Sequence, residues 1–305
     1  MKESAWIWKN GELLAWEKAT THVLTHALHY GTAVFEGIRA YRTEKGPAIF
    51  RGREHFTRLI HSANIYQMPP PYTAEELEEA AKQLIKVNQH HSCYIRPLYY
   101  YGYRELGVNP EGNPVDAVIA AWEWTAYHGE KASEQGIRCK MSSWCRIESR
   151  ILPTHAKCTA NYANSVLAKR EALDCGYDEA ILLNMAGNVS EGTGENLFLV
   201  KEGKVFTPPD SDGPLPGITR ETVRQIAKDL AIPCTSKSIA RDELFLADEL
   251  FFTGTAAEVT PIREVDGRMI GNGRRGAITE TIQQRYFAIV HGQEEAYHKW
   301  LTFVD

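Results

Sequence analysis

The chain has 305 residues, enough for about two domains, and 43% hydrophobic with 24% charged residues is the balance of a folded globular protein. With 34 Lys and Arg against 39 Asp and Glu, the net charge is −5, and no dense basic run is present, which argues against a nucleic-acid partner. The six scattered cysteines include no Cys-x-x-Cys pair, so we expect reduced thiols. No apolar stretch has the length of a signal peptide core or a membrane span, and we expect a cytoplasmic protein.

The chain begins with a predicted β-hairpin. Residues 5–9 and 12–16 are rich in apolar side chains, and Asn10-Gly11 between them is the pair that best tolerates the positive φ angles of a two-residue turn. In chain order, the first half is then predicted to form a helix, a second helix that Thr73 caps, and two strands, at residues 54–66, 73 onward, 94–101 and 115–122.

A change in composition marks the predicted domain boundary. Residues 125–135 are polar and small, which is typical of a connection between domains. We therefore predict a small N-terminal α/β domain over residues 1–124, an interdomain loop over 125–135 and a larger domain over 136–305.

The second half is predicted to contain more strands than helices, with a hairpin turn at Asp266-Gly267. In chain order, its helices and strands are expected at residues 162–175, 179–183, 197–200, 204–207, 220–230, 249–253 and 276–290. Because strands and helices do not alternate regularly, the pattern favours an α+β class over a doubly wound sheet.

Two motifs are better explained without a ligand. Residues 271–276 (GNGRRG) match the dinucleotide-binding pattern, but only about thirty residues follow, too few for the rest of a Rossmann unit. The pairs His26, His29 and His90, His91 have no third ligand at a usable spacing, so no metal site is predicted.

Lys157 stands among small residues in the segment PTHAKCTANY, with no acidic residue within several positions. A surface lysine is the ordinary interpretation of such a segment. Small neighbours can also desolvate an amine, and burial lowers the pKa of an amine and makes it a nucleophile toward carbonyl compounds. The segment alone leaves both interpretations open.

Glu191 stands in a glycine-rich turn, VSEGTGENLF, that enters an apolar strand. A turn acid exposed to water is the simple interpretation. The alternative is a carboxylate that pairs with a buried cation, because an uncompensated charge at such a position is costly.

Two further segments present backbone donors. Residues 215–220 (LPGITR) lead into a helix, so the N–H groups of Ile218 and Thr219 and the Thr219 hydroxyl would point to an anion, although helix capping explains the same residues. Residues 251–258 (FFTGTAAE) form a buried strand that breaks into small residues, which brings backbone donors close to a ligand at its end.

Taken together and in this order, these segments resemble the branched-chain aminotransferases of the fold-type IV pyridoxal-phosphate enzymes. The resemblance covers nearly the whole chain, and its specificity comes from the ordered set, since each segment alone is weak. Besides the segments above, it rests on HALHYGTAVFEGIR at 26–39, REHFTRL at 53–59, YIRP at 94–97 and GVNP at 107–110. It implies a two-domain fold with a barrel-like β core in the larger domain, and pyridoxal 5′-phosphate as the cofactor.

The resemblance assigns roles around this cofactor. Lys157 would hold it as a Schiff base and would then move a proton between the substrate α-carbon and the cofactor. Glu191 would pair with the protonated pyridine nitrogen, Tyr162 would donate to the ring oxygen O3′, and Leu215 would pack on the ring. The phosphate would be bound by one guanidinium, a helix start and a loop, which here are Arg58, Ile218, Thr219 and Thr255.

The resemblance also assigns the substrate pocket. Tyr94 and the backbone of Thr255 and Ala256 would bind the α-carboxylate, and Arg96 would bind the second carboxylate of glutamate or 2-oxoglutarate. The apolar side chain of the substrate would be surrounded by Tyr30, Phe35, Gly37, Trp124 and Tyr127. Family members build this site from two subunits, with Tyr30 and the loop that carries Val108 reaching across, so a homodimer or a larger homo-oligomer such as a hexamer is implied.

The implied activity is transfer of an amino group between leucine, isoleucine or valine and 2-oxoglutarate. A D-amino-acid or (R)-amine transaminase of the same fold shares the Lys157 and Glu191 chemistry and is the alternative, although the pair Tyr94 and Arg96 favours L-branched-chain substrates. A nicotinamide-dependent oxidoreductase is a remote alternative, because it would rest on the poor match at residues 271–276.

Overall fold

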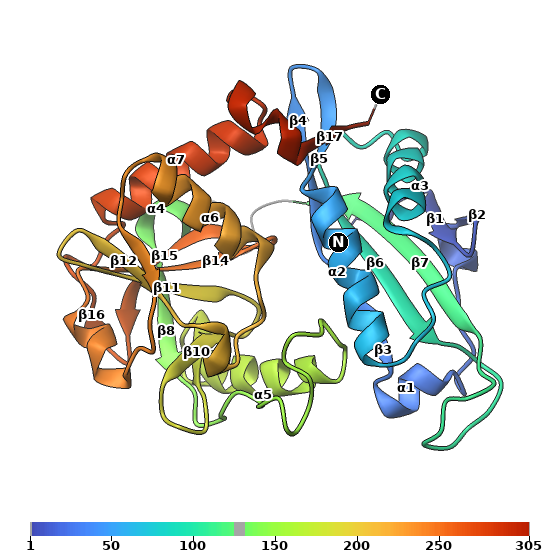
Figure 1. The fold of residues 1–305 in the computed structure, drawn as a ribbon, viewed down its shortest axis with the longest axis horizontal. Coiled ribbons are helices and arrows are strands. Elements are labelled where there is room, and N and C mark those ends of the chain that lie inside the picture. Colours follow the sequence, from blue (N-terminus) through green and yellow to red (C-terminus); the bar gives the residue numbers. More distant parts are fainter. Residues whose placement is uncertain (1, 125–131, 305) are drawn as a thin grey trace. The chain divides into compact units, whose positions relative to one another are not determined.

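The computed structural model describes residues 2–124 and 132–304, and these form two compact units (Figure 1). The described residues divide between a first unit within 1–124, 156–160 and 288–305, and a second unit within 125–155 and 161–287. Within these residues, no helix is both long and apolar enough to cross a membrane.

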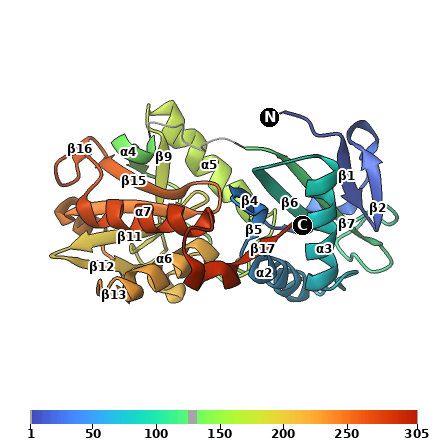
Figure 2. The same cartoon turned by 90° about the horizontal axis from the view of Figure 1, so that it is seen from above.

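The first unit is built on one antiparallel sheet. In chain order, its elements are β1 (Trp6–Lys9), β2 (Glu12–Ala15), α1 (His26–Tyr30), β3 (Ala33–Phe35), β4 (Ile38–Thr43), β5 (Gly46–Phe50), α2 (Gly52–Ile65), α3 (Ala74–Val87), β6 (Cys93–Tyr101), β7 (Val115–Glu123) and β17 (Leu301–Phe303). The strand order is β17-β5-β4-β6-β7-β1-β2, and β3 pairs with β6. Helix α2 packs against β3 and β6, and α3 packs against β1 and β7 (Figures 1 and 2).

The turn and the helix cap that the sequence predicts for the first unit are confirmed by the structure. Asn10 and Gly11 have φ angles of 50° and 92° in the turn between β1 and β2. Thr73 and Glu76 form a capping box at the start of α3, in which each side chain accepts a hydrogen bond from the backbone N–H of the other residue. The buried faces of α2 and α3, with Phe56 among their fully buried side chains, join the sheet in one apolar core.

The second unit is built on a nine-stranded mixed sheet. In chain order, its elements are α4 (Ala132–Gln135), β8 (Ile137–Met141), α5 (Asn161–Asp174), β9 (Glu179–Leu183), β10 (Val189–Gly192), β11 (Asn196–Lys201), β12 (Lys204–Thr207), α6 (Ile218–Asp229), β13 (Cys234–Ser236), β14 (Glu249–Gly254), β15 (Glu258–Val265), β16 (Arg268–Met269) and α7 (Ala277–Val290). The strand order is β10-β9-β8-β15-β14-β11-β12-β13, with β16 on β15. Helix α5 packs on β8 and β9, and α6 packs on β13 and β14.

The predicted α+β class is confirmed, but the domain ranges differ from the prediction. Residues 156–160 belong to the first unit because they run beside β3, where the Phe35 N–H donates to the Lys157 carbonyl at 3.0 Å. Residues 288–305 belong there because β17 pairs with β5. Of the predicted interdomain loop, residues 125–131 lie outside the described residues, and the last four residues form α4.

Candidate active site

The predicted site residues fall on both units, and each group is described by itself. The first unit carries Tyr30, Phe35, Gly37, Arg58, Tyr94, Arg96, Val108, Trp124 and Lys157. The second unit carries Tyr162, Glu191, Leu215, Ile218, Thr219, Thr255 and Ala256. Tyr127, predicted for the substrate pocket, lies outside the described residues.

Lys157 is half-buried in the first unit. Its backbone N–H donates to Ser62 Oγ at 3.0 Å, and Ser62 is fully buried on α2. Its Nζ lies 4.9 Å from the centroid of the Phe35 ring. The backbone of Lys157 is therefore fixed from two sides, by α2 and by β3, while its amine lies against an aromatic face.

Arg96 lies against the same aromatic ring. Tyr94 and Arg96 are two residues apart in β6, so their side chains lie on the same face of the strand. The guanidinium carbon of Arg96 is 4.7 Å from the centroid of the Phe35 ring and 5.4 Å from that of the Tyr94 ring. Arg96 Nε is buried without a hydrogen-bond partner among the described residues. The Trp124 ring centroid lies 4.9 Å from that of Tyr94 and extends the aromatic surface. A cation with an unsatisfied donor beside aromatic rings suits a ligand that is apolar at one point and carries an acid at another.

Gly37 is required by this arrangement. A Cβ atom at Gly37 would lie 1.9 Å from the Tyr94 hydroxyl oxygen, so any other residue would displace Tyr94. The prediction that Gly37 and Tyr94 belong to one pocket thus has a direct steric reason.

Arg58, on α2, is paired with a buried carboxylate that was not predicted as part of the site. Its Nε donates to Glu36 Oε1 at 2.6 Å, and its Nη2 donates to Glu36 Oε2 at 2.9 Å. Burial alone would raise the pKa of Glu36, but the charge of Arg58 and the contact with His55 outweigh it and hold the pKa below its ordinary value. Glu36 is therefore ionised at neutral pH, and it binds Arg58 in the two-pronged manner that fixes a guanidinium plane.

Tyr30 and Val108 project to the surface instead. Their side chains are 42% and 86% exposed. His26, fully buried on α1, lies with Nε2 2.8 Å from the carbonyl oxygen of Gly107 and so fastens the loop that carries Val108. Both residues are therefore presented outward on the first unit.

Glu191 anchors the second group. It lies in β10 rather than in an exposed turn, and it is only 6% exposed, so the simple interpretation of an exposed turn acid is wrong. The pairing of β10 with β9 shifts register between Val189 and Glu191, which is the mark of a bulge that re-aims a side chain. The Leu215 N–H donates to Glu191 Oε2 at 3.0 Å.

Arg146 is the cation beside Glu191, and it was not predicted. Arg146 Nε and Glu191 Oε1 lie 2.8 Å apart, and both side chains are more than nine-tenths buried. The Nε–H is not directed at a hydrogen-bond acceptor among the described residues, so the contact is an ion pair without a well-formed hydrogen bond. The buried carboxylate thus has the countercharge that the alternative interpretation of Glu191 required.

Asn196 joins two predicted residues. Its Nδ2 donates to the Leu215 carbonyl at 2.9 Å and lies 3.4 Å from Glu191 Oε2. In the sheet, Asn196 pairs with Thr253, two residues before Thr255. This amide was also missed, although its place at the start of the apolar run NLFLV is a signal that sequence reasoning can use.

Helix α6 begins at Ile218, within the predicted donor segment. Gly217 precedes it without a side-chain cap, and a Cβ at Gly217 would lie 1.8 Å from Asn196 Oδ1. Thr255 and Ala256 follow β14 in a turn, and Tyr162 is the second residue of α5. An uncapped helix start that only glycine permits is suited to an anion such as a phosphate.

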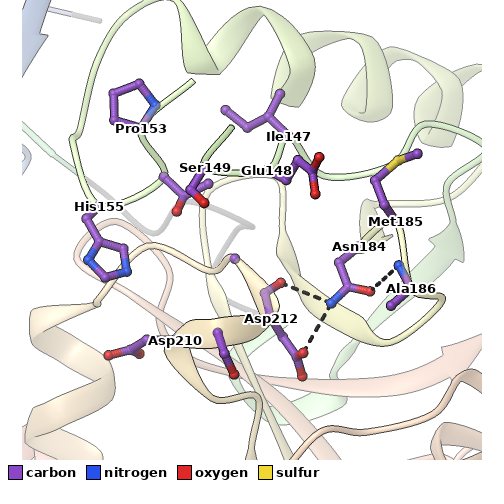
Figure 3. Close-up of a pocket in the computed structure, with 13 residues that line it drawn as sticks. Ile147, Glu148, Ser149, Pro153, His155, Asn184, Met185, Ala186, Asp210 and Asp212 are labelled. Carbon is purple, nitrogen blue, oxygen red and sulfur yellow. Dashed lines mark hydrogen bonds between the residues drawn. The ribbon is translucent and has the colours of Figure 1, made fainter. Parts of the chain in front are cut away.

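The second unit also has a cavity of about 580 Å³, which none of the predicted site residues lines (Figure 3). Asn184 spans it by donating to the backbone oxygen and to Oδ1 of Asp212, at 3.4 and 3.2 Å. Its lining is Ile147, Glu148, Ser149, Pro153, Thr154, His155, Asn184, Met185, Ala186, Asp210, Ser211, Asp212 and Gly213. A phosphate dianion would meet three carboxylates here, so we do not assign the cofactor to this cavity.

The predicted residues fit pyridoxal phosphate in charge and donor type. Arg58 and the start of α6 offer donors for a dianion, and Glu191 offers a buried carboxylate for a protonated ring nitrogen. Lys157 offers an amine on a fixed backbone. Helix α6 begins without a side-chain cap, and an uncapped helix start is a site that a phosphate oxygen can approach.

The chain is similar to known proteins over its length. The family model described as amino-transferase class IV matches residues 33–265. The branched-chain-amino-acid aminotransferase of Pseudomonas aeruginosa is 50% identical over 298 residues, which cover 98% of this chain and 97% of that protein.

Solved structures of branched-chain amino acid aminotransferases are similar to this chain as well. The crystal structure of the Escherichia coli branched-chain amino acid aminotransferase has a TM-score of 0.97 at 48% identity and covers 99% of this chain and 100% of that one. The structure of a second branched-chain amino acid aminotransferase, complexed with N-(5′-phosphopyridoxyl)-L-glutamate, has a TM-score of 0.96 at 47% identity and covers both chains fully. A third, from the thermophilic archaeon Thermoproteus uzoniensis with norvaline, has a TM-score of 0.95 at 45% identity and covers 99% of this chain and 100% of that one. The predicted fold type is confirmed by these similarities.

Proposed function

The chain belongs to the amino-transferase class IV family, and on this premise we propose that it transfers the amino group between branched-chain L-amino acids and 2-oxoglutarate. Pyridoxal 5′-phosphate is the cofactor of this family, and a phosphopyridoxyl adduct of glutamate is bound in one of the similar structures. The names of the relatives support leucine, isoleucine and valine as amino donors.

One observation carries the proposal. The amine of Lys157 and the guanidinium of Arg96 lie against the same Phe35 ring, 4.9 and 4.7 Å from its centroid. An aliphatic side chain can pack on the aromatic surface, and the second carboxylate of glutamate can pair with Arg96. One pocket can therefore accept two chemically different substrates in turn beside a single amine.

The cofactor, when bound, supplies an aldehyde for the amino group and a ring that withdraws electrons from the substrate α-carbon. Lys157 would hold the cofactor at rest and then remove and return the proton at the α-carbon with Nζ. Glu191 would keep the ring nitrogen protonated, since its buried carboxylate stabilises a neighbouring cation.

The remaining roles are positional. Arg58, Ile218, Thr219 and Thr255 would bind the phosphate, Tyr162 would donate to O3′, and Leu215 would pack on the ring face. Tyr94, Thr255 and Ala256 would bind the α-carboxylate, while Phe35, Gly37, Trp124 and Tyr127 would surround the aliphatic chain. These assignments follow the resemblance to the family and the residue types present.

We also propose that the active form is at least a homodimer. Tyr30 and Val108 are exposed, and so are Leu28 and Leu106 on the neighbouring segments, at 63% and 49%. Apolar side chains gathered at the surface in this way are typical of an interface. Sedimentation of the holoenzyme should show a dimer or a multiple such as a hexamer, and an active monomer would refute this part.

The test of the activity is a substrate panel on purified enzyme with 2-oxoglutarate, read as glutamate formed. L-leucine, L-isoleucine and L-valine should be the best donors. Faster turnover of D-amino acids or of (R)-amines would refute the branched-chain assignment and keep the cofactor. The same enzyme should have the visible absorbance of its cofactor, and we expect it in the cytoplasm, where its six free cysteines stay reduced.

A further inference from the structure

Glu36 is a buried charge to which the roles described so far give no task. It lies between β3 and β4 and has no exposed surface. Four donors surround its carboxylate: Arg58 Nε, Arg58 Nη2, His55 Nδ1 and the Gly37 N–H, at 2.6, 2.9, 2.7 and 3.2 Å. A carboxylate with this many donors is held in one orientation, and it holds its partners in turn.

His55 acts here as a neutral donor. Burial lowers the pKa of its imidazole below the ordinary value, and the charges of Arg58 and Lys157 add to this effect, while Glu36 opposes it. Because the ionised carboxylate can only accept, the contact at 2.7 Å is a hydrogen bond from Nδ1–H of an uncharged ring. Arg58 is thus the cation that balances Glu36.

A purely structural role explains this arrangement poorly. Removing two charges from water is costly, and a buried ion pair is commonly no more stabilising than apolar residues of the same volume. What an apolar residue at position 36 could not do is set the rotation of a guanidinium. The two hydrogen bonds from Nε and Nη2 do this, and they fix the plane of Arg58 to β3, the strand that ends in Phe35.

We propose that Glu36 is a positioning residue that orients Arg58 toward the phosphate of the cofactor, with His55 holding the carboxylate in place. This inference rests on the proposed function, in which Arg58 binds the phosphate. Glu36 also accepts from the Gly37 N–H, so the same carboxylate fixes the backbone that admits Tyr94. Cofactor anchoring and the shape of the substrate pocket are thereby set by one group.

The test compares two ligands of the apoprotein that differ only in the phosphate. Equilibrium binding of pyridoxal 5′-phosphate and of pyridoxal is measured for wild type, Glu36→Gln, Arg58→Met and the double variant Glu36→Gln/Arg58→Met. Glu36→Gln should weaken binding of pyridoxal 5′-phosphate at least about tenfold, the effect of losing one well-placed charge-assisted contact. Pyridoxal binding should change less than about threefold, because it lacks the group that Arg58 binds.

The double variant separates positioning from folding. It removes both charges together, so no lone charge stays buried, and the thermal midpoint of the apoprotein reports its fold. In the Arg58→Met background, Glu36→Gln should add no further loss of pyridoxal 5′-phosphate affinity. Glu36→Asp keeps the charge on a shorter arm and should bind with intermediate affinity. Glu54→Gln lies on α2, the helix that carries Arg58, but its carboxylate pairs with Arg51; it is the control and should bind as wild type.

Three results would overturn the inference. Unchanged affinity in Glu36→Gln would show that Arg58 needs no orientation. Tighter binding would show that Glu36 only offsets the charge of Arg58. A general defect would be the third result, seen as a loss of affinity that is equal for both ligands or equal with and without Arg58. A wild type that binds neither ligand would overturn the proposed function along with it, whereas an active wild type with any of these three results overturns the inference alone.

Discussion

The pair of Arg146 and Glu191 offers a way to separate a structural from a chemical role. Glu191→Gln keeps the shape of the side chain and removes its charge, which leaves Arg146 alone at a site where both side chains are more than nine-tenths buried. Removing one partner of a buried pair costs about 3–5 kcal/mol. At about 2–4 °C per kcal/mol for a unit of this size, the thermal midpoint of the apoprotein should fall by about 6–20 °C.

Activity should fall for a different reason. Without the Glu191 carboxylate, the protonated ring nitrogen of the cofactor would lose its proposed counterion. The proton transfer at the substrate α-carbon should therefore slow at least about a hundredfold. The assay is the half-reaction with leucine, followed by the cofactor spectrum at a temperature well below the midpoint of every variant. Cofactor should stay bound, because the phosphate contacts are untouched.

The double variant Arg146→Met/Glu191→Gln decides between the two roles. It removes both charges, so the stability lost in Glu191→Gln should largely return. Activity should stay low, because the carboxylate is still absent. If the double variant recovered activity together with stability, Glu191 would serve only to neutralise Arg146, and unchanged turnover in Glu191→Gln itself would refute the assignment outright.

Three further predictions test other parts of the site. Lys157→Ala should lose transamination almost entirely, whereas the control Lys82→Ala should not. Borohydride reduction of the wild-type holoenzyme should fix the cofactor on Lys157. A reduced adduct mapped to another lysine would contradict the assignment. Arg96→Leu should lower kcat/KM about thirty- to a thousandfold for 2-oxoglutarate and glutamate but little for leucine, with Arg96→Lys restoring part of the loss; equal losses in both half-reactions would assign Arg96 to the α-carboxylate or the fold. The pKa of Glu36 is depressed in the folded chain, so its stabilisation is complete above the ordinary value of 4.5 and is lost as the pH falls below it. The difference in unfolding free energy between wild type and Glu36→Gln should therefore shrink by about 1.4 kcal/mol per pH unit below that point in urea titrations, and a difference that is constant from pH 7 to pH 3.5 would contradict this.

Elements with local signals were predictable from the sequence. The turns at Asn10-Gly11 and Asp266-Gly267 and the capping box of α3 each act over a few residues, and the structure confirms them. Strands β3, β4 and β5 were missed. β4 and β5 form a local hairpin with each other, but β3 and β4 also pair with β6, and β5 pairs with β17, about 50 to 250 residues away in the chain. No local pattern reports these distant pairings.

Sequence reasoning proposed the principal residues of the candidate site but not the residues that support them. The segments around Lys157 and Glu191 were recognised because their order along the chain resembles a family. The glycines that flank Glu191 suggested an exposed turn, yet pairing with β9 makes the segment a buried strand. Arg146 and Glu36 were not predicted, since each meets its partner across 45 or 22 residues of chain and the contact exists only in the folded protein.

These two unpredicted residues, Arg146 and Glu36, each supply a buried countercharge to a predicted site residue. Arg58 is held by Glu36 in the first unit, and Glu191 is held by Arg146 in the second, so these two charges, both proposed to face the cofactor, already have buried countercharges. Such pairs are costly to bury, and a fold selected for stability alone would gain little from them. They are useful when charges must stand in a fixed orientation before the ligand arrives, because no reorganisation is then needed during reaction. Substitutions at the supporting residues should therefore change cofactor binding and rate more than an equal loss of stability elsewhere in the same unit would.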